Sequence, residues 1–123
     1  MKEIKFRAWD KKHKRMMNVA NLCFLDGELV QICLEDETAI DYIDAVSPDD
    51  VILMQYTGLQ DCAGNEIYEG DILRIGEEDW VVIWDERYAT FTVKQEKEIC
   101  SFDFVADDYV ELVNNIYEQG AEK

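Results

Sequence analysis

The sequence predicts a mainly β protein built around a small β-barrel, on three observations. Residues 4–9 alternate in the period of two that is typical of a half-buried strand. Asp26-Gly27 lies between two apolar runs, which is a strong signal for a two-residue hairpin turn. Between residues 51 and 113, short apolar segments alternate with polar turns at the spacing of a small barrel.

The expected elements follow from these patterns in chain order. Residues 10–15 form a charged turn, and Ser47-Pro48-Asp49-Asp50 marks a break at which a short helix could start. The last segment has an acidic start that suits a helix, but its β-branched residues favour a strand followed by a short tail. The expected strands are residues 4–9, 16–25, 28–34, 51–57, 72–75, 80–84, 90–93 and 109–113, with one further short strand between the turns at Gly64 and Gly70-Asp71.

Composition predicts one packed domain. The chain has 123 residues, 48% of them hydrophobic, with three Trp, six Tyr and five Phe. This length and composition are enough for a hydrophobic core that needs no disulfide or metal to support it. We divide residues 1–123 into an N-terminal strand, hairpin and acidic loop (1–50), a barrel (51–118) and a tail (119–123). No apolar run approaches the roughly 18 residues of a membrane span, and no signal-peptide pattern occurs, so a cytoplasmic protein without membrane contact is expected.

Charge is divided unevenly along the chain. Residues 1–15 carry a net charge of +5, and the remainder carries −21 of the total of −16. Such an acidic field keeps a protein soluble and repels nucleic acid from most of its surface. Direct nucleic-acid binding is therefore not expected, and the basic N-terminal segment becomes a candidate contact surface.

The sequence offers no catalytic or cofactor-binding pattern. Cys23, Cys33, Cys62 and Cys100 contain no C-x-x-C pair, and the single His13 has no partner, so free and mostly buried thiols are expected rather than zinc or disulfides. Neither glycine-rich phosphate-binding motif occurs. The turn from Asp61 fails the calcium-loop pattern, so Asp61 is expected to bind nearby backbone. We expect no metal, no cofactor and no enzymatic activity.

The aromatic residues leave three uses open: core packing, a peptide groove and base stacking. Residues 66–88 hold eight acids against two bases, a net charge of −6, which opposes stacking on nucleic acid. The residues proposed for partner contact combine the basic N-terminal segment with nearby aromatic side chains. They are Lys5, Arg7, Trp9, Lys11, Lys12, Tyr56 and Tyr68.

Three stretches of the chain carry a resemblance to a known family. They are residues 4–10, IKFRAWD; residues 53–72, which contain LMQYTGLQD and GNEIYEGDI; and residues 115–118, NIYE. Together they resemble the YopX-like proteins of bacteriophages and prophages. The resemblance implies an SH3-like barrel with the N-terminal strand and hairpin packed on it, and a location in a bacterial host cell. It carries over no functional residue, because the family has no established biochemical function.

Three functions remain open on these grounds. The first is a non-enzymatic module that binds a host or phage protein, and the second is a homo-oligomer with a structural or assembly role. The third is an acidic mimic of nucleic acid, since a duplex about 35 Å long carries about 20 phosphate charges, close to the −21 of residues 16–123.

Overall fold

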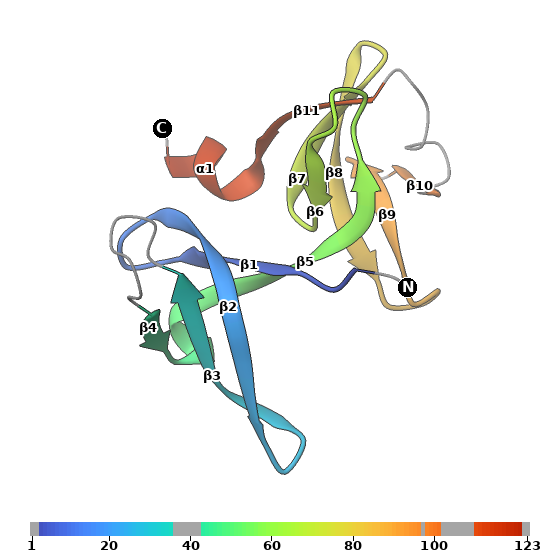
Figure 1. Ribbon diagram of the computed structural model, residues 1–123. Coiled ribbons are helices and arrows are strands. Elements are labelled where there is room, and N and C mark those ends of the chain that lie inside the picture. Colours follow the sequence, from blue (N-terminus) through green and yellow to red (C-terminus); the bar gives the residue numbers. More distant parts are fainter. Residues whose placement is uncertain (1–2, 36–42, 97, 102–109, 122–123) are drawn as a thin grey trace. The chain divides into compact units, whose positions relative to one another are not determined.

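The computed structural model describes residues 3–35, 43–96, 98–101 and 110–121, and it consists mainly of antiparallel β-structure (Figure 1). One sheet has six strands in the order β4-β3-β2-β1-β5-β6, and the other has five in the order β10-β9-β8-β7-β11. One short α-helix follows the last strand. The predicted mainly β class is confirmed. The chain divides into two compact units, residues 5–55 and residues 56–123 with 1–4, and β5 carries the chain from one to the other.

The bounds of the elements agree with most of the expected segments. In chain order they are β1 (Phe6–Asp10), β2 (Arg15–Leu25), β3 (Glu28–Glu35), β4 (Ile43–Val46), the 3-10 helix η1 (Pro48–Asp50), β5 (Val51–Gln60), β6 (Glu66–Tyr68), β7 (Asp71–Ile75), β8 (Glu78–Asp85), β9 (Thr90–Gln95), β10 (Glu98–Ser101), β11 (Val110–Asn115) and α1 (Ile116–Ala121).

The unit of residues 5–55 is a sheet in which β1 lies between β2 and the first half of β5. Its apolar core consists of four buried residues, Ala8, Ile32, Leu34 and Val51, with half-buried aliphatic side chains around them. The hairpin predicted at Asp26-Gly27 is confirmed. Both residues have positive φ angles, 51° and 83°, as a two-residue turn joining twisted strands requires.

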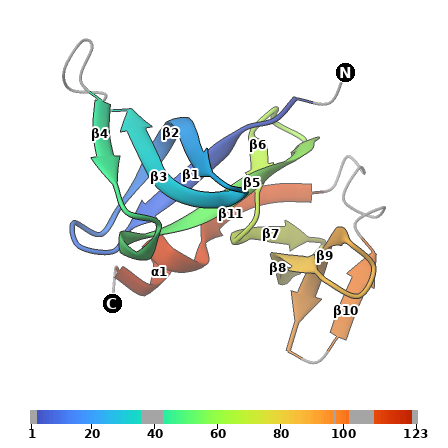
Figure 2. The same ribbon diagram turned by 90° about the horizontal axis from the view of Figure 1, so that it is seen from below.

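The unit of residues 56–123 is a meander in which β7, β8, β9 and β10 pair in succession, while β11 returns beside β7 (Figure 2). Its core is larger than that of the other unit and consists of Ile67, Leu73, Trp80, Val82, Phe91, Val93 and Val110. In the described part of the chain this sheet runs from β10 to β11 without closing. The expected closed barrel is therefore not seen, and two open sheets take its place.

Three elements were absent from the sequence prediction or differ from it. β4 and β10 are edge strands of four residues each, too short to leave a periodic signal. The tail expected at residues 119–123 starts inside the helix α1 (Ile116–Ala121). The Asn115 side chain caps this helix, since its Oδ1 accepts hydrogen bonds from the backbone amides of Tyr117 and Glu118 at 3.1 and 2.8 Å. Most of the acidic loop expected before Pro48 lies at residues 36–42, outside the described residues.

Matched leucine substitutions test the core of the second unit. Leu73 lies on β7 and is fully buried, whereas Leu25 is 64% exposed. We expect Leu73→Ala to lower the free energy of unfolding by about 2–5 kcal/mol, because it removes buried methyl groups and leaves a cavity. Leu25→Ala is expected to change it by less than about 0.5 kcal/mol. Urea unfolding followed by tryptophan fluorescence measures both, and equal effects would contradict the assigned burial.

Candidate interaction surfaces

The basic residues between β1 and β2 form a turn built over one buried carboxylate. The Lys11–Arg15 side chains are all exposed, while the preceding Asp10 is buried. Asp10 Oδ1 accepts hydrogen bonds from the backbone amides of Lys12 and His13 at 3.1 and 3.3 Å. Its Oδ2 lies 2.8 Å from His13 Nδ1 and 3.3 Å from Arg15 Nε. The turn therefore has a fixed backbone from which its cationic side chains project.

The Asp10 carboxylate remains charged beneath this turn. Burial raises its pKa, but hydrogen bonds from the His13 ring and backbone, together with Arg15, outweigh burial and hold the pKa below its ordinary value. Lys11 is also tied down, because its Nζ donates a hydrogen bond to the Asp49 carbonyl at 3.1 Å. Lys12 and Lys14 are the exposed lysines that remain toward the tip of the turn. The surface is a small basic patch on a strongly acidic protein.

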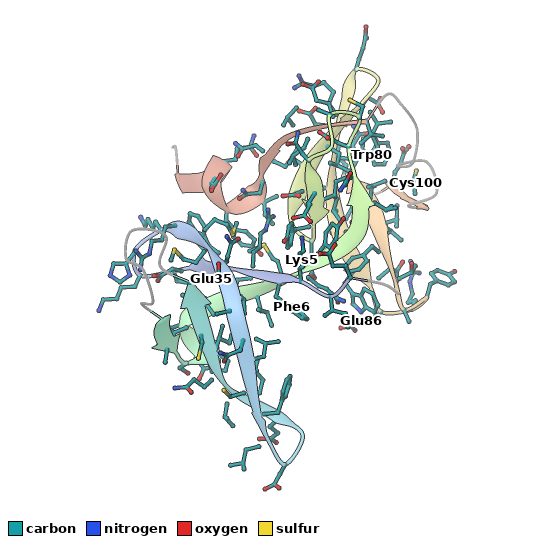
Figure 3. The ribbon with its side chains drawn as sticks, in the orientation of Figure 1. Lys5, Phe6, Glu35, Trp80, Glu86 and Cys100 are labelled. Carbon is teal, nitrogen blue, oxygen red and sulfur yellow. The ribbon has the colours of Figure 1, made fainter. Side chains whose placement is uncertain are left out.

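The residues proposed from the sequence for partner contact occupy different environments. Lys11 and Lys12 are exposed in the basic turn, whereas Lys5 and Arg7 are half-buried on or beside β1, where each already has an interaction partner. Trp9 is only 7% exposed. Figure 3 shows the side chains along both units, with Lys5 labelled. Of the basic set, only the lysines of the turn are fully accessible.

The two tyrosines of the proposed set are brought together by strand pairing. Tyr56 on β5 faces Tyr68 on β6, with ring centroids 5.4 Å apart and planes tilted by 40°. Tyr56 is buried and Tyr68 half-buried. The pair therefore contributes packing between β5 and β6, and its geometry is that of neighbouring core aromatics.

A surface that sequence reasoning missed lies at the tip of the β2–β3 hairpin. β2 pairs with β1 only from Arg15 to Asn18, and β3 pairs with β4 only from Ile32 to Glu35. Beyond these residues the hairpin continues as a two-stranded ribbon, visible in Figure 1 as the long extension beyond β1 and β4. A two-stranded ribbon has little stability of its own, and packing against another element or a partner would stabilise it.

The tip of this ribbon carries large apolar side chains in solvent. Phe24 and Leu25 are 63% and 64% exposed, and Val30 is 46% exposed. The register shifts between Cys23 and Phe24, leaving Val30 as the extra residue of a β-bulge, a feature that re-aims side chains. Exposed Asp26 and the neighbouring Glu28 add negative charge. The apolar tip could have been suspected from Phe24-Leu25 directly before the Asp-Gly turn.

The turn after β5 is organised by Asp61, as the sequence predicted. Asp61 is buried, and its two carboxylate oxygens accept hydrogen bonds from the backbone of Ala63, Asn65 and Leu112 and from the Asn65 side chain, at 2.8–3.1 Å. Gly64 has the expected positive φ, 87°. The carboxylate is thus occupied by backbone amides, and within the described residues no cluster of three or more metal-ligating side chains occurs.

The four thiols are free, as expected, but they are less buried than predicted. Cys62 is exposed, and the other three are half-buried. Burial and the neighbouring Cys23 across the hairpin raise the pKa of Cys33, which disfavours its thiolate.

Comparison with known proteins decides the family. The model of the YopX protein family matches residues 5–121. The chain belongs to this family. A comparison with curated proteins gave no match. Among solved structures, the chain is similar to protein EF1440 from Enterococcus faecalis, with a TM-score of 0.68 and 23% sequence identity over 98% of this chain and 97% of the other. At that identity the likeness shows a shared fold. No described helix is long and apolar enough to cross a membrane.

The buried Asp61 makes the stability of this YopX-family protein pH-dependent. Burial raises the pKa of Asp61, but the hydrogen bonds from Leu112, Asn65 and Ala63 outweigh it and hold the pKa below the ordinary 3.8. A carboxylate with a lowered pKa stabilises the fold above its unfolded pKa, and this contribution is lost as the pH falls through the folded pKa.

We therefore expect Asp61→Asn to lower the free energy of unfolding by about 1–3 kcal/mol at pH 7, because charged acceptors give the stronger hydrogen bonds. The difference from wild type should shrink as the pH falls below about 4. Urea unfolding at pH 7, 5, 4 and 3 measures it, with the exposed Glu77→Gln as the matched control. A difference that stays constant with pH would contradict the role of the charged carboxylate.

Proposed function

We propose that this protein is a non-enzymatic protein-interaction module that acts in the cytoplasm of a bacterial host. The observation that carries the proposal is the β2–β3 ribbon, which leaves its sheet and presents Phe24 and Leu25 to solvent. Large exposed apolar side chains cost solubility, and they are typical of surfaces that a partner covers.

The chemistry of the tip indicates the kind of partner. Asp26 and Glu28 flank the apolar side chains, so the complementary surface is an apolar recess with a basic rim. Because the whole chain carries −16, its field accelerates encounter with a basic host or phage protein. We further infer kinship of residues 56–118 with SH3-like barrels, which the β7–β10 meander and the return of β11 beside β7 support.

The proposal is tested with variants of the hairpin tip. A photo-crosslinking residue at position 24 identifies the partner, and the same residue at the exposed position 77 serves as control. With the purified partner, we expect Phe24→Ser combined with Leu25→Ser to weaken binding at least about tenfold in calorimetry, as loss of central apolar contacts does.

A matched variant tests whether loss of any exposed apolar side chain weakens partner binding. Ile4 is 72% exposed, and Ile4→Ser is expected to leave the affinity unchanged. The melting temperature of the tip variant should stay within about 2 °C of wild type, because the tip contributes no core contact. Equal affinity of the tip variant and wild type would reject the hairpin as the binding surface. Displacement of the partner by duplex DNA would favour nucleic-acid mimicry instead.

Self-association is a second candidate function, favoured by the charges at the two ends of β2. β2 begins at the basic turn and ends at the acidic tip of the hairpin. Its 11 residues span roughly 33 Å. Such ends can meet head to tail between copies of the chain, which is a heterologous contact that forms rings or filaments.

For self-association we expect a monomer–oligomer equilibrium that weakens as salt rises, since the contact is electrostatic. Lys12→Glu combined with Lys14→Glu should abolish it by reversing the basic turn. Sedimentation equilibrium at 50 and 300 mM salt measures both effects. A monomer at every salt concentration would exclude this candidate and leave binding to another protein.

A further inference from the structure

A groove of about 400 Å³ opens on the unit of residues 56–123, along β8, β9 and β10. It lies on the face of the sheet opposite the apolar core, because Asp85 pairs with Thr90 and Thr92 with Ile83, out of phase with the core pair Val82 and Val93. Figure 2 shows the three strands side by side, and Figure 3 labels Cys100 at the β10 side.

One wall of the groove contains a polar atom that lacks a partner. Thr92 is 5% exposed, and its Oγ1 has no hydrogen-bond partner although it is fully shielded. Leaving a buried hydroxyl unpaired is costly, and native structures seldom do so without a reason. Thr92 lines the groove, so a ligand that inserts as far as the covered Oγ1 would satisfy this hydroxyl.

Among the polar groups of the groove, Asp85 is the one that only accepts hydrogen bonds. Asp85 has a side chain only 6% exposed, and an ionised carboxylate is acceptor-only, while the hydroxyls of Thr90 and Thr92 can accept as well. Tyr88, 73% exposed, adds an aromatic face, and Ile99 an apolar wall. A buried carboxylate beside hydroxyls and an aromatic face suits a planar cation with several donors.

The protein's own Arg87 already shows this chemistry at the rim. Its Nε lies 3.7 Å from Asp85 Oδ1, and its Cζ lies 5.6 Å from the centroid of the Tyr88 ring. Both contacts are long, and the Arg87 side chain is 71% exposed, so this guanidinium is held weakly. A second guanidinium from outside could take its place and reach the unpaired hydroxyl.

The charge around the groove favours a cation over an anion. Glu86 follows Asp85 and Glu98 begins β10, and the whole chain carries a net charge of −16. The described bases near the groove in sequence are Arg87 at its rim and Lys94 on β9. An anionic ligand would meet this field in addition to the Asp85 carboxylate, whereas a cation is attracted by both.

We propose that this groove binds an arginine side chain presented by a partner polypeptide, with Asp85, Thr92 and Tyr88 as the recognising groups. The guanidinium donates to the Asp85 carboxylate and to Thr92 Oγ1, stacks on Tyr88, and displaces Arg87. This inference concerns a different unit from the hairpin tip, so its failure would leave the proposed function untouched.

The test is an NMR titration of the full chain with Nα-acetyl-arginine methylamide. We expect saturable shifts at the amides of residues 85–92 and 98–100, with a dissociation constant on the order of 1–10 mM, as for a single small fragment. The isosteric citrulline compound, which lacks the charge, should give no saturable shift. Equal shifts with both compounds, or none with either, would overturn the proposal. Tighter binding of free arginine would also overturn it, pointing to a small-molecule ligand.

Three variants assign the roles. Thr92→Val keeps the shape of the side chain and should weaken binding at least about threefold, with a melting temperature equal to or above wild type because an unpaired hydroxyl is removed. Asp85→Asn, which can still accept the Arg87 amide, should weaken binding at least about tenfold. Arg87→Gln should tighten binding at least about twofold by removing the competitor. Loss of binding in Arg87→Gln would mean that the groove takes an acceptor ligand, and would overturn the proposal.

Discussion

Both sheets depend on buried aspartates that accept backbone N–H groups at the turns. Asp10, Asp61, Asp71 and Asp85 are the buried acids of the described residues, and each lies next to a connection between two strands. Asp71, 1% exposed, accepts the Tyr68 amide at 2.7 Å, and Asp85 accepts the Arg87 amide at 3.0 Å. If a turn amide were buried without such an acceptor, the fold would lose more free energy than one hydrogen bond contributes to stability. In a chain with 28 acids, these four fix how the strands are joined.

The same constraint places the charged surfaces. The backbone of the basic turn is fixed because Asp10 accepts hydrogen bonds from the amides of Lys12 and His13, so this backbone does not have to be ordered when a partner binds. The groove on β8–β10 likewise has Asp85 fixed by the turn that follows it. The hairpin tip differs, because its turn is exposed and its ribbon has no third strand. Of the three surfaces, the hairpin tip is the one whose structure a bound partner would stabilise most.

Sequence reasoning succeeded where the signal is local. The Asp-Gly hairpin, the Asp61 turn and the strands around them follow from residues adjacent in the chain. It failed at the short edge strands β4 and β10, whose four residues each carry too little periodic signal and which are strands because β3 and β9 pair with them. Trp9 was expected to contact a partner because it is an aromatic residue in the basic N-terminal segment, yet it is buried. No sequence pattern could reveal the unpaired Thr92 hydroxyl, which depends on what surrounds it.

The division of charge favours a foreign partner over a second copy. Two copies approach each other with −16 on each, a repulsion that acts at long range, whereas the attraction of a basic turn for an acidic tip acts only near contact. At physiological salt the screening length is about 8 Å, so the repulsion weakens but never changes sign. A basic partner meets attraction at both ranges, and an arginine on its surface would meet the Asp85 carboxylate and the unpaired Thr92 hydroxyl in the proposed β8–β10 groove. Self-association therefore requires a contact strong enough to overcome the whole field, while binding of a basic protein requires only a fitting surface.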